Sequence, residues 1–320
     1  MTKAKNSFAA LLDPIQGIDN VLKEVTATPQ LDQPRLLFVR MQEHIPQVDA
    51  LAELLVDQLV NYVVPLRKRR EAFAQSNNST TGGDMAAMSR LRREAKRLLV
   101  SYNQAHPGRY GEVGELIAYV VAVRYLGAAQ LGAKMALKTS SEMPVHGVDG
   151  LHGSQSDDGS VLFYLLESKL IPSATDASRE MVASVAEHQA DRGRMLNELR
   201  LVSDLSNLDA LEGEAREAAK SFFNSYTGDG SHLRRRDIHV GSLVFSESAF
   251  DDKLPRDMKQ RPEIHEEHLE KLYAAKHKTF ANNLKNQADA KGVDLGGCIV
   301  FLVAIPDVNE FKRIFAGLNT

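Results

Sequence analysis

Two acidic residues and a lysine near the middle of the chain have types and a spacing that suit joint chemistry. Glu167 and Lys169 lie two positions apart at the end of the apolar run 161–166, and Asp149 lies upstream of that run. Alternate residues of a strand point to the same face, so this carboxylate and this ammonium leave the strand side by side. We expect Asp149 to join them if its own segment pairs with the run as a neighbouring strand.

Such a group has the make-up of a site for a hard cation. Mg²⁺ prefers oxygen ligands and keeps several waters, so Asp149, Glu167 and a backbone carbonyl such as that of Ser168 are suitable ligands. A bound cation lowers the pKa of its water and offsets the charge that gathers on a reacting phosphate. Lys169 would orient or deprotonate the attacking water and help to neutralise the transition state. The group therefore indicates metal-dependent phosphodiester hydrolysis.

Glu115 is a fourth candidate for this site. It shares a predicted helix face with Gly111, Ala118 and Ala122, and no cation lies three or four positions from it. Small residues let such a face approach a sheet closely. The acid is either a solvated edge residue or a group aimed inward at metal or water, and the second interpretation fits the other three residues.

A structural interpretation of the same residues remains open. An acid and a lysine two positions apart after an apolar strand form a common pattern, and Glu167 with Lys169 can be a plain ion pair at a strand end. Asp149 can equally serve a Gly-Val-Asp-Gly turn. The residues alone allow both the metal site and this alternative.

The elements that must position these residues alternate between helix and strand from Gly111 onward. Residues 111–131 have apolar residues at helical spacing, and the continuous apolar run 161–166 is typical of a strand covered on both faces. Pro172 ends that strand, and Ser173 or Thr175 can cap the next helix. This alternation predicts an α/β sandwich around a mixed β-sheet. The other predicted elements are strands at 134–138, 145–151, 238–245 and 298–305, and helices from about 173 to 208 and from 263 to 290.

Residues 1–106 are predicted to form a mostly helical N-terminal region, and residues 107–320 the domain that holds the site. Helical spacing is clear at 48–64 and 85–102. Between Arg67 and Arg97, nine Lys and Arg residues stand against three Asp and Glu. These basic helices are candidates to bind DNA or an acidic surface of a partner protein, and a plain solvated face is the alternative.

Composition narrows the class of protein. The 320 residues carry a formal net charge of −3, which excludes a protein that holds polyanions by bulk positive charge alone. The single cysteine, Cys298, excludes an internal disulfide scaffold and a cysteine-rich zinc site. The chain has no signal-peptide core and no apolar run of about 20 residues, so we expect a cytoplasmic protein without a membrane segment.

Four short blocks contain the candidate residues. They are Gly114-Glu115-Leu116-Ile117-Ala118-Tyr119, Lys134-Met135-Ala136-Leu137-Lys138-Thr139-Ser140, Val145-His146-Gly147-Val148-Asp149-Gly150-Leu151-His152 and Leu166-Glu167-Ser168-Lys169. In this order the blocks resemble those of the HamA family, the nuclease subunits of the Hachiman anti-phage system. The similarity covers about residues 109–184, and the first hundred residues and the C-terminal third add little to it.

The resemblance implies a PD-(D/E)XK restriction-endonuclease-like core and Mg²⁺-dependent cleavage of DNA, with Mn²⁺ as a substitute. It also implies a HamB-like partner, a superfamily 2 helicase that senses aberrant DNA during infection and releases or directs the nuclease. In the family pattern Asp149, Glu167 and Lys169 take the catalytic motif positions, and Glu115 takes the helix acid. Val148 stands where the motif name suggests proline, a common departure that leaves the assignment in place.

Three more basic residues are candidates for contacts with DNA phosphates. Lys138 ends the first predicted strand, and Arg234 and Arg235 precede the fourth. A solvated strand end is the alternative interpretation for all three. Two other functions also stay open: a restriction-type or DNA-repair nuclease of the same fold, and a non-catalytic adaptor whose core only binds DNA or protein.

Overall fold

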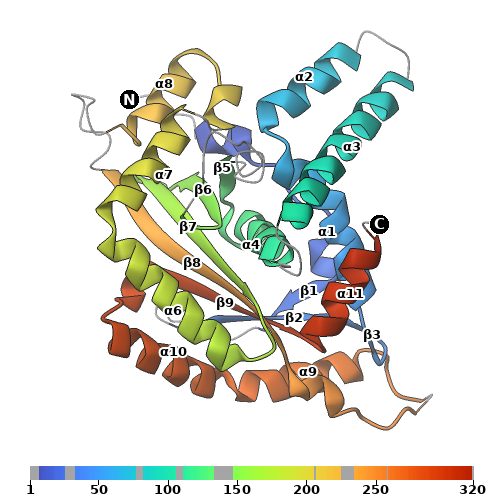
Figure 1. The fold of residues 1–320 in the computed structure, drawn as a ribbon. Helices are drawn as coiled ribbons and strands as arrows, with labels where there is room; N and C mark the ends of the chain where they lie inside the picture. Colours follow the sequence, from blue (N-terminus) through green and yellow to red (C-terminus); the bar gives the residue numbers. More distant parts are fainter. Residues whose placement is uncertain are drawn as a thin grey trace.

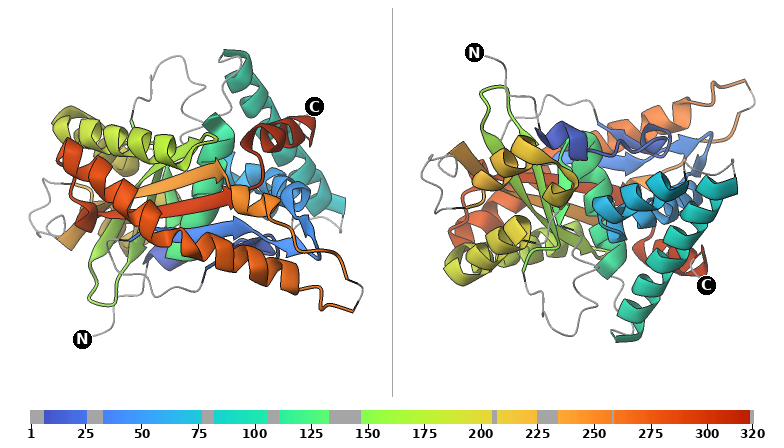
Figure 2. Two further views of the ribbon diagram at one scale, coloured as in Figure 1. Left: turned by 90° about the horizontal axis from the view of Figure 1, so that it is seen from below. Right: turned by 90° about the horizontal axis from the view of Figure 1, so that it is seen from above.

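A seven-stranded mixed β-sheet forms the centre of the protein, with helices on both faces (Figures 1 and 2). The computed structural model describes residues 7–25, 33–76, 82–105, 111–132, 147–204, 207–224, 234–257 and 259–318. The strand order is β1-β2-β9-β8-β7-β6-β5. The strands are β1 Leu22–Glu24, β2 Arg35–Val39, β5 Ala129–Gly132, β6 Gly150–Gln155, β7 Val161–Leu170, β8 Arg235–Ser246 and β9 Cys298–Ile305; β3 Met41–Gln42 and β4 Ile45–Pro46 form a separate hairpin.

The sheet combines a parallel centre with antiparallel edges. Strands β2, β9, β8 and β7 run parallel to one another, whereas β6 and β5 follow β7 in antiparallel order and β1 pairs antiparallel with β2. Helices cover both sides of the parallel strands, so these strands are apolar almost throughout, as the burial of β9 shows. The carboxyl ends of four neighbouring strands therefore lie along one edge of the sheet.

The helices form one layer on each face of the sheet. They are α1 Val48–Val63, α2 Leu66–Ser76, α3 Gly82–Ala105, α4 Gly111–Leu126, α6 Ala174–Ala190, α7 Arg192–Asp204, α8 Gly213–Ser221, α9 Ile264–Ala275, α10 His277–Lys291 and α11 Val308–Leu318. Helices α6 and α10 pack side by side on one face, whereas α4 lies on the other and packs against α1 (Figure 1). Every residue of α4 from Glu112 to Val123 is buried, because the helix lies between the sheet and α1.

The N-terminal region contains helices α1, α2 and α3, and it also extends the sheet. The helices expected at 48–64 and 85–102 are α1 and α3, and α2 and α3 project together from the body of the molecule (Figure 1). Strand β2 pairs with β9 through contacts such as Leu37 with Val303, so the two ends of the chain share one hydrophobic core. The structure thus connects residues 1–106 to the rest of the fold through a common sheet.

Most predicted elements occur, but several boundaries differ. The helical pattern at 111–131 ends as a helix at Leu126, and residues 129–132 form β5, a strand that the sequence did not predict. The helix expected over 263–290 breaks into α9 and α10. The strand expected at 298–305 is β9, and the strand at 161–166 continues to Leu170, where Pro172 follows. The strand expected at 145–151 was placed too early, because β6 begins only at Gly150. The helix after Ser173 is capped by the Ser173 hydroxyl, as predicted, and breaks at Asp191 into α6 and α7.

One sequence prediction falls outside this description. The strand expected at 134–138, with Lys138, lies outside the described residues. Within the described part of the chain, no helix is long and apolar enough to cross a membrane.

Candidate active site at the carboxyl end of β7

Asp149 lies directly before β6 and is bound to β7 by its backbone and its side chain. Its N–H donates to the Leu166 carbonyl at 2.8 Å. Its carboxylate oxygen Oδ2 accepts two further hydrogen bonds, both at 2.8 Å, from the backbone N–H and the hydroxyl of Ser168. The register of β6 on β7 ends at the pair of Gly150 with Leu166, and Asp149 lies just outside it. Its charge nonetheless acts on Glu167, so the two acids lie close enough to interact.

Glu167 and Lys169 form an ion pair on the face of β7 that α6 covers. The Lys169 ammonium donates to Glu167 Oε1 at 2.7 Å, and both side chains are largely buried. Gly241 of β8 is level with Glu167, and a side chain there would press on Met181 of α6. Ser184 of α6 adds a hydrogen bond to Glu167. The predicted side-by-side exit of the acid and the lysine is therefore present.

The group of Asp149, Glu167 and Lys169 contains two acidic residues and one basic residue. Burial raises the pKa of Glu167, and the nearby charge of Asp149 raises it further, despite the ion pair with Lys169. Burial opposes the charge of Lys169, but Glu167, Asp149 and Glu180 together raise its pKa. Lys169 is thus held as an ammonium ion, which suits it to orient water and stabilise negative charge rather than to remove a proton.

The donor set fits a hard divalent cation. Asp149 and Glu167 supply carboxylate oxygens, and their mutual repulsion is what a cation between them would relieve. The N–H and C=O of one strand residue point to the same side, so the Ser168 carbonyl also faces the end of β6, where Asp149 lies. Among the described residues, no three His, Cys, Asp or Glu side chains are grouped to hold a metal. The site therefore offers two carboxylates and a carbonyl, whereas Glu115, which the sequence also suggested as a ligand, is not grouped with Asp149 and Glu167 among the described residues.

Glu115 is buried on α4 and bound to a helix that the sequence did not connect with it. Its Oε2 accepts a hydrogen bond of 2.7 Å from the Tyr62 hydroxyl of α1. The adjacent Gly114 packs on β7, where an added Cβ would lie 3.3 Å from the Ser168 hydroxyl. Glu115 thus faces inward, and the partner shown for its carboxylate is the Tyr62 hydroxyl, whereas its expected role toward metal or water stays a prediction.

Arg234 and Arg235 lie at the opposite end of the strands from Glu167. Arg235 is level with Val161 in β7, six residues before Glu167, which corresponds to about 20 Å along a strand. Its guanidinium donates to Asp237 at 2.7 Å and to the Phe222 carbonyl, and that of Arg234 lies 5.6 Å from the Phe222 ring. The structure does not bring these arginines to the acids and the lysine.

Three residues near the site were missed by sequence reasoning about side chains. Ser168 donates to Asp149, Ser184 to Glu167, and the buried Glu198 of α7 accepts the N–H of Val148 at 2.9 Å. The position of Ser168 between Glu167 and Lys169 was a usable signal, since alternation directs it toward α4. Ser184 and Glu198 carry no comparable signal.

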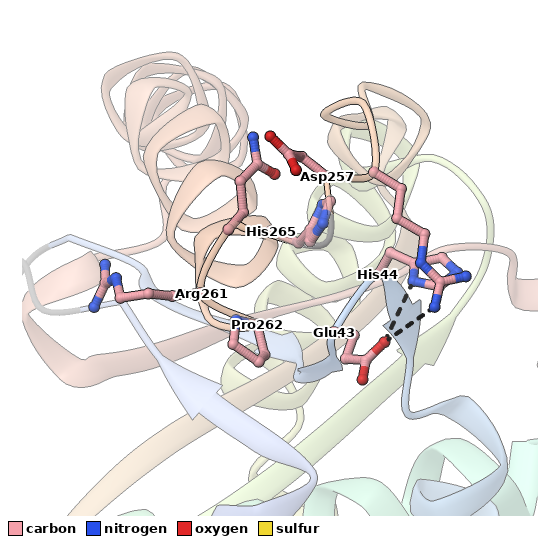
Figure 3. A pocket seen from close by; sticks show the side chains of 8 residues that line it. Glu43, His44, Asp257, Arg261, Pro262 and His265 are labelled. Carbon is pink, nitrogen blue, oxygen red and sulfur yellow. Dashed lines mark ion pairs between the residues drawn. The ribbon is translucent and has the colours of Figure 1, made fainter.

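A second concave region lies near the β3–β4 hairpin, which is separate from the sheet that contains β7 (Figure 3). Its cavity of about 220 Å³ is lined in part by Glu43, His44, Asp257 and His265. Glu43 lies 3.7 Å from Arg256 and 4.0 Å from His44. Acids and bases alternate around this cavity, so its charges offset one another, unlike those around Glu167.

Together, the fold and the group at β7 define a mixed α/β protein with a candidate site for a divalent cation. Comparison with known families agrees with the resemblance seen in the sequence. The family model of HamA matches residues 18–316, nearly the whole chain, and the chain belongs to the HamA family. This membership supports a role related to Hachiman defence. Neither the curated proteins nor the solved structures include a match to this chain.

Proposed function

We propose that this protein is a Mg²⁺-dependent deoxyribonuclease with a PD-(D/E)XK core, acting as the effector of a Hachiman defence system. The observation that carries the proposal is the group at the carboxyl end of β7. There, two carboxylates, Asp149 and Glu167, lie beside the ammonium of Lys169 in a largely buried setting. Membership of the HamA family supports the biological setting.

Each residue has a distinct part in the proposed reaction. Asp149 and Glu167 would hold Mg²⁺, with Mn²⁺ as a substitute, and the Ser168 carbonyl is a third candidate ligand. When bound, the cation supplies an activated water and neutralises charge on the phosphate. Lys169 orients the attacking water and stabilises the negative charge of the transition state through its ammonium. Glu115, hydrogen-bonded to Tyr62, supplies the helix acid of the family pattern.

Cleavage of linear and supercoiled DNA by the purified chain, with Mg²⁺ and with a chelator, tests this proposal. We expect Glu167→Ala and Lys169→Ala to abolish both cleavage and protection of cells from phage while the variants still fold, with a melting temperature lowered by loss of the buried ion pair. Glu267→Ala is a matched control, because Glu267 forms an exposed ion pair with Arg261 away from the site. Protection by the Glu167→Ala variant at wild-type level would contradict the nuclease.

The proposal includes control by a HamB-like superfamily 2 helicase. The chain is weakly acidic overall, so it lacks the general positive charge that holds DNA without a partner. The projecting α3 instead exposes Arg90 and Arg93 beside the apolar Met85 and Met88. We expect the double variant Arg90→Glu, Arg93→Glu to weaken co-purification with the helicase without changing cleavage by the free chain. Unchanged co-purification would show that α3 does not contribute to the interface with the helicase.

A non-catalytic adaptor is the second candidate function. It is favoured by the ion pair of Lys169 with Glu167, which gives each group a partner of opposite charge without a metal. An adaptor would bind DNA or protein through the same fold and would show no metal-dependent loss of DNA. Titration of the wild-type chain with Mn²⁺, followed by electron paramagnetic resonance, separates the two, since the nuclease requires a cation bound at Asp149 and Glu167.

A further inference from the structure

The side chain of Ser168 is placed to control Asp149. Its hydroxyl and its backbone N–H both donate to the same carboxylate oxygen, Oδ2, at 2.8 Å. Ser168 is 9% exposed, so these two hydrogen bonds compete little with water. Both bonds end on Oδ2, which leaves Oδ1 outside them and fixes the direction in which it points.

Asp149 needs such support because it precedes its strand. Strand β6 begins at Gly150, and Gly147 has a φ of 144°, a conformation that allows the chain to bend sharply. The backbone before Asp149 is held by Glu198, which accepts the N–H of Val148. The carboxylate itself is held by Ser168, so the two contacts fix the main chain and the side chain separately.

The side chain of Ser168 lies next to α4, on the face of the sheet opposite Glu167. Alternation along β7 directs Ser168 toward α4, whereas Glu167 and Lys169 face α6. At the contact with α4, Gly114 approaches so closely that an added Cβ would lie 3.3 Å from the Ser168 hydroxyl. The helix that carries Glu115 therefore approaches closely the residue that binds Asp149.

We propose that Ser168 is a positioning residue that aims the carboxylate of Asp149 at a divalent cation shared with Glu167. This inference rests on the proposed function and deepens it, because it assigns a role to the residue between the acid and the lysine. Hydrogen bonds to a metal-binding carboxylate fix its orientation, and their loss typically weakens metal binding about 10- to 100-fold. Ser168→Ala removes one of the two bonds and keeps the backbone one.

A matched control lies on the next strand. Ser242 of β8 pairs with Ser168 in the register, is fully buried, and its hydroxyl has no hydrogen-bond partner in the part of the chain that the structure describes. Ser242→Ala thus removes a buried hydroxyl at the same level of the sheet without touching Asp149. Ser168→Cys is a graded variant, because it keeps a side chain of similar shape but is a weaker donor.

The experiment is Mn²⁺ binding to the full chain by electron paramagnetic resonance, with cleavage and thermal melting measured in parallel. We expect Ser168→Ala to weaken Mn²⁺ binding about 10- to 100-fold, Ser168→Cys to fall between, and Ser242→Ala to bind as the wild type. Cleavage by Ser168→Ala should recover at saturating Mn²⁺, and its melting temperature should resemble that of Ser242→Ala.

Two results would overturn the inference while leaving the nuclease intact. One is Mn²⁺ binding by Ser168→Ala equal to that of the wild type. The other is equal weakening by Ser168→Ala and Ser242→Ala, which would show a general effect of removing buried hydroxyls. Failure of the wild-type chain to bind Mn²⁺ is a different outcome, because it would reject the metal site and this inference together.

Discussion

The two ends of the β7–β8 pair carry similar charges in very different arrangements. At the carboxyl end, Asp149 and Glu167 share one lysine, and burial raises the pKa of Glu167. At the amino end, Arg235 is paired with Asp237, and Arg236 lies 3.3 Å from an oxygen of Asp158. The first end is a buried group with an excess of acid, and the second is a set of matched pairs near the surface.

This difference distinguishes acidic side chains that stabilise the fold through matched pairs from acidic side chains whose charge a bound cation would offset. Hydrogen bonds from Ser160 and Ser156, with the charge of Arg236, keep the pKa of Asp158 below its ordinary value, so its ionised form is already satisfied. Glu167 has the opposite shift, since the folded chain penalises its ionised form. A cation at the carboxyl end would remove that penalty, whereas the amino end offers no comparable gain.

The largest difference in DNA cleavage should appear when one acidic charge is removed at each end and the two variants are compared. Glu167→Gln keeps the shape of the side chain but loses a proposed metal ligand, so we expect DNA cleavage to fall about a hundred- to a thousandfold. Asp237→Asn makes the same change at the amino end and should leave cleavage unchanged. Rates measured at saturating Mg²⁺ check both variants. A similar loss of DNA cleavage in both variants would show that the two ends do not differ in their role.

Low pH should destabilise the fold at β6, the strand next to β7. His152 of β6 is buried, and its Nδ1–H donates to the Ala128 carbonyl at 3.0 Å. Burial lowers its pKa from 6.5 to about 4. The unfolded chain therefore binds the proton more readily between these pH values, and stability falls as pH drops from about 6.5 toward 4, by about 3 kcal/mol for this group.

Urea unfolding at pH 7 and at pH 4.5 checks this expectation. The variant His152→Asn keeps a donor for the Ala128 carbonyl but cannot gain a proton, so its stability should depend less on pH than that of the wild type. His239 of β8, whose pKa burial also lowers to about 4, should contribute in the same direction. An identical pH slope in the wild type and in His152→Asn would contradict the burial argument.

Removing Arg235 should lower the stability of the fold without changing DNA cleavage. Its side chain is 12% exposed, donates to Asp237 and to the Phe222 carbonyl, and lies 5.9 Å from the rings of Phe163 and Phe223. Arg235→Ala should therefore cost about 2 kcal/mol of stability. Cleavage per folded molecule should keep its kcat and KM. Denaturant unfolding together with steady-state cleavage measures both quantities.

Local patterns in the sequence were sufficient for the parts of the site that lie on one strand. The apolar run at 161–166 and the spacing of Glu167 and Lys169 predicted a buried strand with both side chains on one face, because alternation is a property of every strand. The bounds of β9 followed from its continuous apolar run for the same reason. Such features need no knowledge of distant parts of the chain.

Contacts between distant segments were beyond these patterns. Tyr62 and Glu115 are 53 residues apart, and no spacing rule connects a tyrosine of one helix with an acid of another. The pairing of β2 with β9 joins the two ends of the chain, and the sequence showed only that both runs are apolar. The register of β8 on β7, which places Arg234 and Arg235 far from Glu167, also depends on the whole sheet.

The smallest effect is expected for a variant of Arg234. It tests whether bound DNA extends to both ends of the β7–β8 pair. Arg234 is exposed and stacks on Phe222, so Arg234→Ala should change stability by less than about 0.5 kcal/mol. The distance of about 20 Å from the acids corresponds to about six base pairs of duplex. If one duplex spans both ends, the loss of a phosphate contact should lower the salt dependence of DNA binding by about one unit of slope while kcat stays the same.

Binding of a short duplex at several salt concentrations, with Arg313→Ala on α11 as the control for loss of an exposed arginine, measures this slope. We expect Arg234→Ala to lower the slope and Arg313→Ala to leave it unchanged, because a contact with a phosphate releases counterions only where the duplex lies. Equal slopes in the two variants and the wild type would confine DNA to the carboxyl end. The amino end would then serve the fold alone, through the same matched pairs that distinguish it from the group around Glu167.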